Sequence, residues 1–142
     1  MVGIEAQGLY TWKVKKITRY YRMIQDIMNI LLHESGWVMF DIDDTLITRD
    51  NEAIEDVQGI LKMAKNTHHP VAIITARPYS DVNNKLTIQQ LDSHGIEYDL
   101  LAFCPAQLKG DAKRELLGGK EVLMSFGDLD TDLTYSKYSF KV

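Results

Sequence analysis

Three carboxylates and a threonine stand directly after a short apolar run in this chain. Residues 38–40 (Val-Met-Phe) are followed by Asp41, Asp43 and Asp44, and then by Thr45. Carboxylates this close raise one another's pKa unless a cation lies among them. In an extended chain Asp41 and Asp43 point to the same side, and oxygen ligands suit a hard cation such as Mg²⁺. The motif therefore predicts a metal site at the tip of a strand.

Other polar residues end or follow predicted strands further along the chain. Thr75 ends a continuous apolar run, and Asp128 and Asp132 follow a run that ends at Phe126. Strands that alternate with helices predict a parallel sheet with helices on both faces, and such sheets bind ligands beyond the carboxyl ends of their strands. We therefore expect these side chains to meet the acidic motif at one edge of the sheet.

The hydrophobic pattern predicts an α/β fold with a sheet of about five strands. Apolar residues at three- and four-residue steps predict helices at 12–34 and 52–65, from Ser80 to Gly95, and from Asp111 to Leu117. Apolar runs bounded by turn residues predict strands at 37–43, 71–75, 98–103, 121–126 and 138–142. In the first helix Ile17, Tyr20, Tyr21, Ile24, Met28 and Leu31 form the apolar stripe, and in the third we expect Val82, Leu86 and Leu91 to face the core.

The composition is that of an ordinary globular protein. The chain has 142 residues, of which 45% are apolar and 25% charged, with a net charge of −4. This charge gives no general attraction to nucleic acids or anionic membranes. The single cysteine, Cys104, excludes an internal disulfide and fits a reducing compartment. With no signal-peptide pattern and no apolar run of about 20 residues, we expect a cytoplasmic protein without membrane contact.

Taken in order, the motifs resemble those of the haloacid dehalogenase superfamily of phosphatases. They are Asp41-x-Asp43-x-Thr45 after a strand, Thr75 ending a second strand, a lysine at a helix start, and Gly127-Asp128-x-x-x-Asp132 after a later strand. The sequence Thr75-Ala76-Arg77-Pro78 looks like the capless branch, which includes the phosphatase domains of polynucleotide kinase–phosphatases. The resemblance covers residues 38–133 and implies a three-layer Rossmann-like sheet.

The resemblance also implies roles for individual residues. Asp41 would be the nucleophile that forms an aspartyl phosphate, and Asp43 would protonate the leaving oxygen and then activate water. Asp41, the backbone carbonyl of Asp43 and Asp128 would hold Mg²⁺, with Asp132 as a further ligand or a supporting residue. Thr75 would bind the phosphoryl oxygens. An acid at the position of Asp43 favours phosphate esters over halides, because a halide leaving group needs no proton.

Two positions remain open in this assignment. Lys109 and Lys113 both fit the lysine motif, and we favour Lys113 because the family lysine usually lies in the first turn of its helix, which is expected to start at Asp111. Arg77 is a candidate substrate-binding residue, although a surface ion pair explains it equally well.

The spacing of the motifs leaves no room for a cap domain. An open site suits a large phosphorylated substrate, such as a phosphoprotein or a nucleic-acid end. We divide the chain into an N-terminal helical extension at 1–36 and a phosphatase core at 37–142. The extension carries a basic stripe that a nucleic acid could contact, and its large apolar residues make a second copy of the chain another candidate partner.

The sequence therefore predicts a Mg²⁺-dependent phosphomonoesterase. One alternative is a nucleic-acid 3′-end phosphatase. Another is a phosphate-binding regulatory module without turnover, which the presence of both Asp41 and Asp43 argues against. In a receiver domain the phosphorylated aspartate would follow the acidic pair on a later strand, whereas here the acids open the series.

Overall fold

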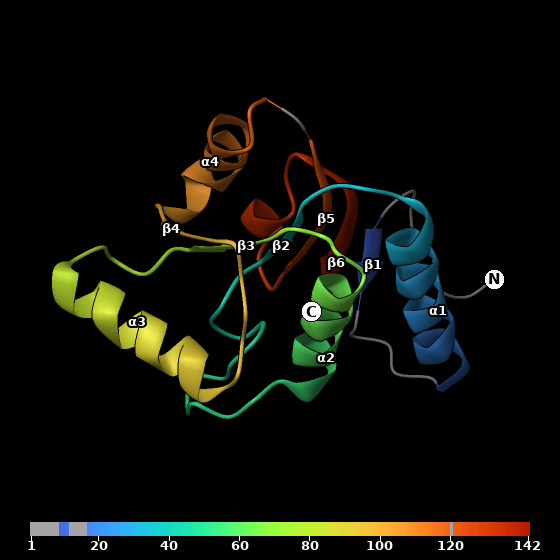
Figure 1. Ribbon diagram of the computed structural model, residues 1–142, viewed down its shortest axis with the longest axis horizontal. Coiled ribbons are helices and arrows are strands. Elements are labelled where there is room, and N and C mark those ends of the chain that lie inside the picture. The colour runs from blue at the N-terminus through green and yellow to red at the C-terminus, as the bar shows by residue number, and fades with distance from the viewer. Residues whose placement is uncertain (1–8, 12–16, 120) are drawn as a thin grey trace.

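The computed structural model describes residues 9–11, 17–119 and 121–142 (Figure 1). The strands are β1 (Leu9–Thr11), β2 (Val38–Phe40), β3 (Val71–Thr75), β4 (Leu100–Phe103), β5 (Val122–Gly127) and β6 (Ser136–Lys141). The helices are α1 (Ile17–His33), α2 (Glu55–Asn66), α3 (Asp81–Ser93) and α4 (Lys109–Leu116), with short 3₁₀ turns at Ala106–Leu108 and Asp130–Asp132. None of the helices in the described ranges is long and apolar enough to cross a bilayer.

All six strands run parallel, in the order β1-β6-β5-β2-β3-β4. The α/β class and the five expected strands are confirmed. The sixth strand, β1, was not predicted, and it pairs with β6 at the edge of the sheet. The N-terminal extension therefore adds a strand as well as α1 to the fold. The expected start of the first helix, at 12–16, lies outside the described residues.

The central strands β2, β3 and β5 are buried at every position and mainly apolar, because both faces of the sheet are covered. Val38 and Phe40 of β2 pack in the larger core with α1, α2 and Leu91 of α3, while Met39 packs on the other face with Leu117, just after α4. In Figure 1, α4 lies above the strands, and α2 and α3 lie below them. Alternate strand residues point to opposite faces, so a strand buried on both sides needs a continuous apolar run.

Stacked aromatic rings join three strands on the face of the sheet that carries the larger core. Phe40, Phe126 and Phe140 occupy matching positions on β2, β5 and β6, with centroids 4.9 and 4.7 Å apart and nearly parallel planes. All three side chains are fully buried. This ladder fixes the carboxyl ends of β2 and β5 side by side, where the functional residues follow.

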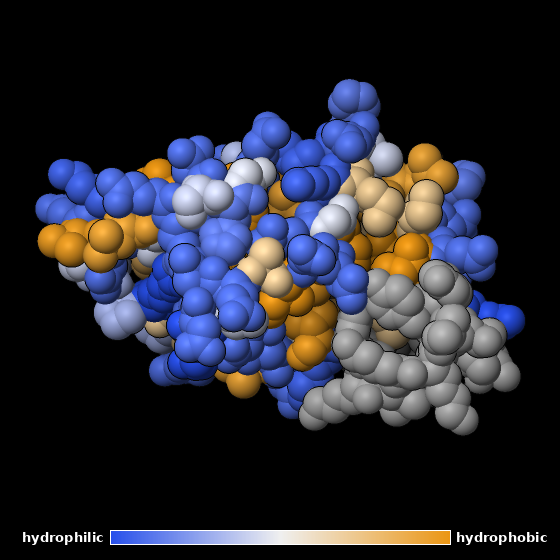
Figure 2. Space-filling view, turned by 90° about the horizontal axis from the view of Figure 1, so that it is seen from below, coloured by the Kyte–Doolittle hydropathy of each residue, from blue (hydrophilic) through white to orange (hydrophobic). Residues whose placement is uncertain are grey.

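Two helices differ in part from the predicted core-facing residues. Among residues 22–33 of α1, Leu31 is buried and Ile24 packs against the core as predicted; Met23, Ile27 and Ile30 are buried as well, whereas Met28 is 43% exposed. On α3 only Thr87 and Leu91 are buried. Val82 and Leu86 are 65% and 57% exposed, and Figure 2 shows hydrophobic side chains on the surface at the end of the molecule where α3 lies. Ser80 caps α3 as predicted, since its hydroxyl accepts a hydrogen bond from the amide of Asn83.

The segments between the motifs are short. The chain from Asp41 to Thr75 forms a turn, α2 and β3, and the chain from Thr75 to Lys109 forms α3, β4 and one 3₁₀ turn. All of these residues are described, and none of them builds a cap domain. The carboxyl edge of the sheet is therefore open to large ligands.

Candidate active site

Three carboxyl groups converge at the carboxyl edge of the sheet. Asp41 follows β2, and its amide bonds to the carbonyl of Phe126 (3.0 Å), which continues the pairing between β2 and β5. Asp128 and Asp132 lie in the turn after β5. One oxygen from each of Asp41, Asp128 and Asp132 lies within 4.8 Å of the other two. These are hard oxygen donors at a spacing that fits one divalent ion.

Lys109 lies between two of these carboxylates. Its Nζ donates to Asp41 Oδ1 (2.8 Å) and to Asp132 Oδ1 (2.6 Å). The lysine is 1% exposed and Asp132 is fully buried. A charge this deeply buried needs close partners of opposite sign, and Lys109 has two. Although burial opposes it, the two carboxylates together raise the pKa of Lys109 above its usual value, so the side chain stays charged.

Two acids of the site, Asp41 and Asp128, resist ionisation. Burial raises the pKa of Asp41 to about 7, and the negative charge of Asp132 adds to this rise against the opposing charge of Lys109. Burial also raises the pKa of Asp128. One ammonium group does not compensate three carboxylates that lie within one small volume. A second positive charge would therefore be favoured at this edge, which agrees with a cation site.

The structure does not support the preference for Lys113 as the motif lysine. Lys113 Nζ donates to Ser125 Oγ (3.0 Å) and to the backbone carbonyls of Asp132 and Thr134 (both 2.6 Å). The preference depended on a helix start at Asp111, but α4 begins two residues earlier. Lys109 therefore occupies the first turn of α4, and it is Lys109 that reaches Asp41.

Asp43 is not part of the three-carboxylate cluster and pairs with Arg77. The guanidinium donates through Nη2 to Asp43 Oδ1 (2.9 Å) and through Nε to Oδ2 (3.1 Å), and its Nη1 donates to Thr87 Oγ1 (3.1 Å). This two-pronged pairing fixes the orientation of a carboxylate better than a single contact does. Of the two explanations left open for Arg77, the structure shows an ion pair, with the acid of the motif itself.

A hollow of about 300 Å³ opens over these groups. Its walls are formed by Asp41, Asp43, Arg49, Ala76, Arg77, Pro78, Lys109, Asp128 and Leu129. The predicted residues Asp41, Asp43, Arg77 and Asp128 therefore share one cavity, and Lys109 joins them. Neither Asp132, which lies beneath this cavity, nor Lys113 lines it.

Two threonines stabilise the loops around this hollow. Thr75, at the end of β3, is 1% exposed and its hydroxyl accepts a hydrogen bond from the amide of Arg77 (3.2 Å). Thr45 is fully buried, and its hydroxyl lies 3.5 Å from Asp41 Oδ2. The loops that carry Asp41 and Arg77 are thus held by side chains from their own strand ends.

Gly127 allows Asp132 to approach the strand. A Cβ atom at position 127 would lie 2.2 Å from the Cβ of Asp132, far inside van der Waals contact. Asp132 also accepts a hydrogen bond from the amide of Leu129 (3.1 Å), which closes the turn that carries Asp128. The glycine of the Gly-Asp motif is therefore required by packing.

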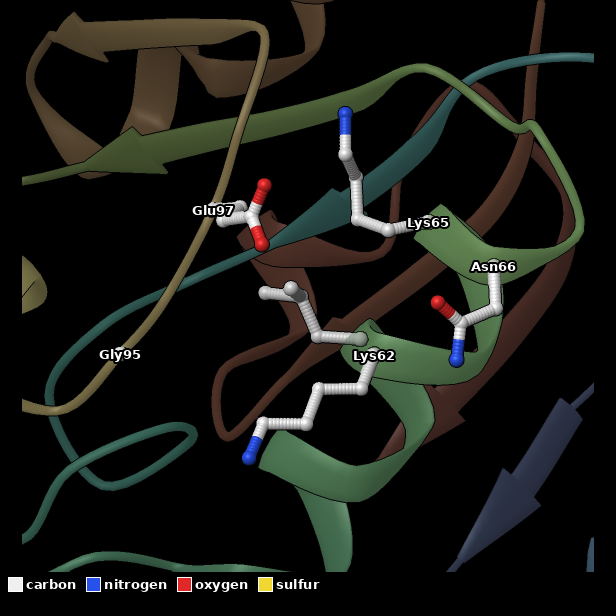
Figure 3. A pocket seen from close by; sticks show the side chains of 6 residues that line it. Lys62, Lys65, Asn66, Gly95 and Glu97 are labelled. Atoms are coloured by element: carbon white, nitrogen blue, oxygen red, sulfur yellow. The ribbon is translucent and has the colours of Figure 1, made fainter.

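A second hollow lies away from this edge, beside α2. Leu61, Lys62, Lys65, Asn66, Gly95 and Glu97 line it (Figure 3). The ammonium groups of Lys62 and Lys65 point in opposite directions in Figure 3, and Lys65 is paired with Asp99 at 2.9 Å. The two lysines do not converge on one anion, so this hollow is not a phosphate site.

Sequence reasoning missed the residues that support the site from below. Thr87 anchors Arg77 from α3, and Ser125 lies beneath Lys113 in the middle of β5. A buried polar residue within an apolar stripe was the available signal, because such residues need partners that only the fold supplies.

Comparison with known proteins agrees with this arrangement. A family model described as haloacid dehalogenase-like hydrolase matches residues 38–99, and no curated protein matches. A chain from the solved structure entitled "Structure of Pnkp1/Rnl/Hen1 complex" is similar with a TM-score of 0.57 and 22% identity, over 78% of this chain and 47% of that one. The protein thus spans about half of its structural neighbour. The family match, the shared fold and the motifs confirm the predicted resemblance, and residues 38–99 of this chain are similar to haloacid dehalogenase-like hydrolases.

Proposed function

We propose that the protein is a Mg²⁺-dependent phosphomonoester phosphatase that uses Asp41 as its nucleophile. The observation that carries this proposal is the position of Asp41: it shares an open cavity with Asp43 and Asp128, and Lys109 neutralises one of its oxygens. The family match independently supports a hydrolase.

The reaction follows from the positions of two acids. A carboxylate oxygen of Asp41 bonds to phosphorus while the bond to the leaving oxygen breaks, and Asp43 gives its proton to that oxygen. In the second half Asp43 takes a proton from water, the water oxygen bonds to phosphorus, and the Asp41–phosphorus bond breaks. Arg77 keeps Asp43 directed into the cavity throughout both halves.

Lys109 completes the site in this proposal, while Thr75 supports the loop that carries Arg77. Phosphoryl transfer spreads negative charge over the equatorial oxygens, and catalysis consists mainly of positioning and stabilising that charge. The Lys109 ammonium, held by Asp41 and Asp132, is the fixed cation nearest to the attacking oxygen. We therefore assign the motif lysine to Lys109 and a supporting role to Lys113.

The residues at the carboxyl edge fit a magnesium ion. Asp41 and Asp128 would hold it, with the backbone carbonyl of Asp43 as a further predicted ligand. Asp132 already accepts hydrogen bonds from Lys109 and from the Leu129 amide. We therefore favour a supporting role for Asp132 over a role as metal ligand. A bound Mg²⁺ would neutralise phosphoryl charge and orient the ester.

The test compares two aspartates of the same loop. Asp41→Asn should abolish Mg²⁺-dependent hydrolysis of a small phosphate ester, because an amide cannot form the aspartyl phosphate. Asp44→Asn is the matched control: Asp44 pairs with Arg49 at the surface, and its φ of 60° is one that asparagine tolerates. Near-normal turnover by Asp41→Asn would exclude Asp41 as nucleophile. Binding of phosphate without turnover by the wild-type protein would instead favour the regulatory module.

A nucleic-acid 3′-end phosphatase is the second candidate. The described residues form no cap, and the cavity is open beside a further hollow, so a strand end could enter. Comparison of 3′-phosphorylated oligonucleotides with phosphopeptides as substrates separates this candidate from a general phosphatase.

A further inference from the structure

A third hollow, distinct from the one beside α2, adjoins the catalytic cavity. It measures about 340 Å³ and is lined by Ala76, Arg77, Pro78, Tyr79, Phe103, Cys104 and Pro105. Three of these residues, 76–78, also line the catalytic cavity, so the two hollows share one wall. We call the four remaining residues, Tyr79, Phe103, Cys104 and Pro105, the aromatic cleft.

The chemistry of the two hollows differs. The catalytic cavity contains three carboxylates, whereas no carboxylate lines the aromatic cleft. The only charged lining residue is Arg77, whose guanidinium is already paired with Asp43 and Thr87. A cleft of this kind suits an uncharged apolar group attached to a charged one that binds next door.

The walls of the cleft favour a planar group. Tyr79 and Phe103 pack edge to face, with centroids 5.4 Å apart and planes at 76°. This contact orients both rings, although Tyr79 remains 65% exposed. A third ring beside such a pair gains stacking or edge contacts that an alkyl chain does not offer.

The cleft also adjoins the residue that orients Asp43, the proposed acid for the leaving oxygen. Asp43 would protonate the leaving oxygen, and its carboxylate is held within 3.1 Å by Arg77. Arg77 belongs to the shared wall, so a leaving group that starts beside Asp43 is adjacent to the entrance of the cleft.

We propose that the aromatic cleft binds a planar aromatic ring on the leaving alcohol, so that the preferred substrates are phosphomonoesters of ring-bearing alcohols. This inference rests on the proposed phosphatase activity and specifies its substrate class. The shared chemistry is the ring, which could belong to an aryl group or to a nucleobase.

The kinetic test compares esters with similar leaving alcohols. The wild-type protein with Mg²⁺ should hydrolyse 2-phenylethyl phosphate with a kcat/KM about three- to tenfold above that for butyl phosphate, the range that one aromatic pair contributes. Tyr79→Ala and Phe103→Leu should bring this ratio close to one, because each removes a ring that favours the aromatic ester. Tyr79→Phe keeps the ring and should keep the ratio.

Val82→Ala is the matched control, because Val82 is as exposed as Tyr79 and does not line the cleft. The second arm compares kcat/KM for nucleoside 3′-monophosphates with kcat/KM for a sugar phosphate that lacks the base. A preference in either arm that depends on Tyr79 supports the cleft and identifies the source of the ring. A ratio near one in both arms, or a preference that survives loss of both rings, overturns it.

A binding test needs no turnover. Cys104, the single cysteine of the chain, lines the cleft and is partly exposed. We expect 3-phenylpropylphosphonate to slow its modification by N-ethylmaleimide, and pentylphosphonate to have little effect. Equal protection by the two phosphonates would overturn the cleft even in an active enzyme. Absence of all ester hydrolysis together with selective protection would refute the phosphatase and leave the ring site standing.

Discussion

Replacement of Asp41 by asparagine should change how the stability of the metal-free protein depends on pH. The pKa of Asp41 is raised from 3.8 to about 7 in the folded chain, mainly by burial. Between these values the folded state keeps a proton that the unfolded state has lost. The free energy of unfolding therefore falls as pH rises through this window.

The size of this effect follows from the shift. The difference between the two pKa values corresponds to about 4 kcal/mol at most, and the loss is complete above pH 7. Asparagine resembles the protonated acid and has no such loss. Asp41→Asn should therefore be close to the wild-type protein in stability near pH 4 and increasingly more stable than it up to pH 8.

Urea unfolding in EDTA at pH 5, 6, 7 and 8, followed by circular dichroism, measures this difference. The control Asp44→Asn should keep the fall in stability with rising pH that the wild-type protein shows, since it retains Asp41. Saturating Mg²⁺ should remove most of the wild-type loss at pH 8, since a bound cation stabilises the ionised carboxylates. Parallel pH profiles for wild type and Asp41→Asn would refute the argument that burial destabilises the ionised form.

Three further predictions concern the same edge of the sheet. Lys109→Met should lower kcat by about a hundredfold or more by removing a fixed charge from the site. Lys113→Met should mainly lower the free energy of unfolding in urea, by about 1–3 kcal/mol, because it leaves buried carbonyls unpaired. Equal kinetic losses would contradict the reassignment. Gly127→Ala should displace Asp132 and abolish the Mg²⁺-induced rise in melting temperature, and an unchanged rise would show that the turn can adapt. EDTA should abolish hydrolysis and added Mg²⁺ should restore it. Full activity in EDTA would exclude a metal-dependent reaction.

The sequence was sufficient where a local signal and the fold agree. Residues 71–74 are apolar and are followed by Thr75, since both faces of β3 are buried, and residues 71–75 form a strand. The cap at Ser80 depends only on its own hydroxyl and a nearby amide, and it was also predicted correctly. The position of Asp41 beside Asp128 follows from the general rule for parallel sheets.

The errors arose where tertiary contacts decide. On α1 the apolar stripe is wide enough to allow neighbouring faces, and packing buries Ile27 while leaving Met28 exposed. On α3 the apolar residues Val82 and Leu86 remain at the surface because only the last turns of the helix meet the core. The strand β1 is three residues long and gains its stability from β6, a partner more than 120 positions away.

The two lysines of α4 both fit the sequence motif, but they contact different positions along the strands. Lys109 and Lys113 are four residues apart, so they lie on the same side of the helix, about 6 Å apart along its axis. Two residues of a strand cover about 6.6 Å. Ser125, the partner of Lys113, pairs in register with Met39, two residues before Asp41. One turn of the helix thus spans two strand positions: Lys113 reaches the interior of the sheet, and Lys109 reaches the first residue beyond it, where the nucleophile lies.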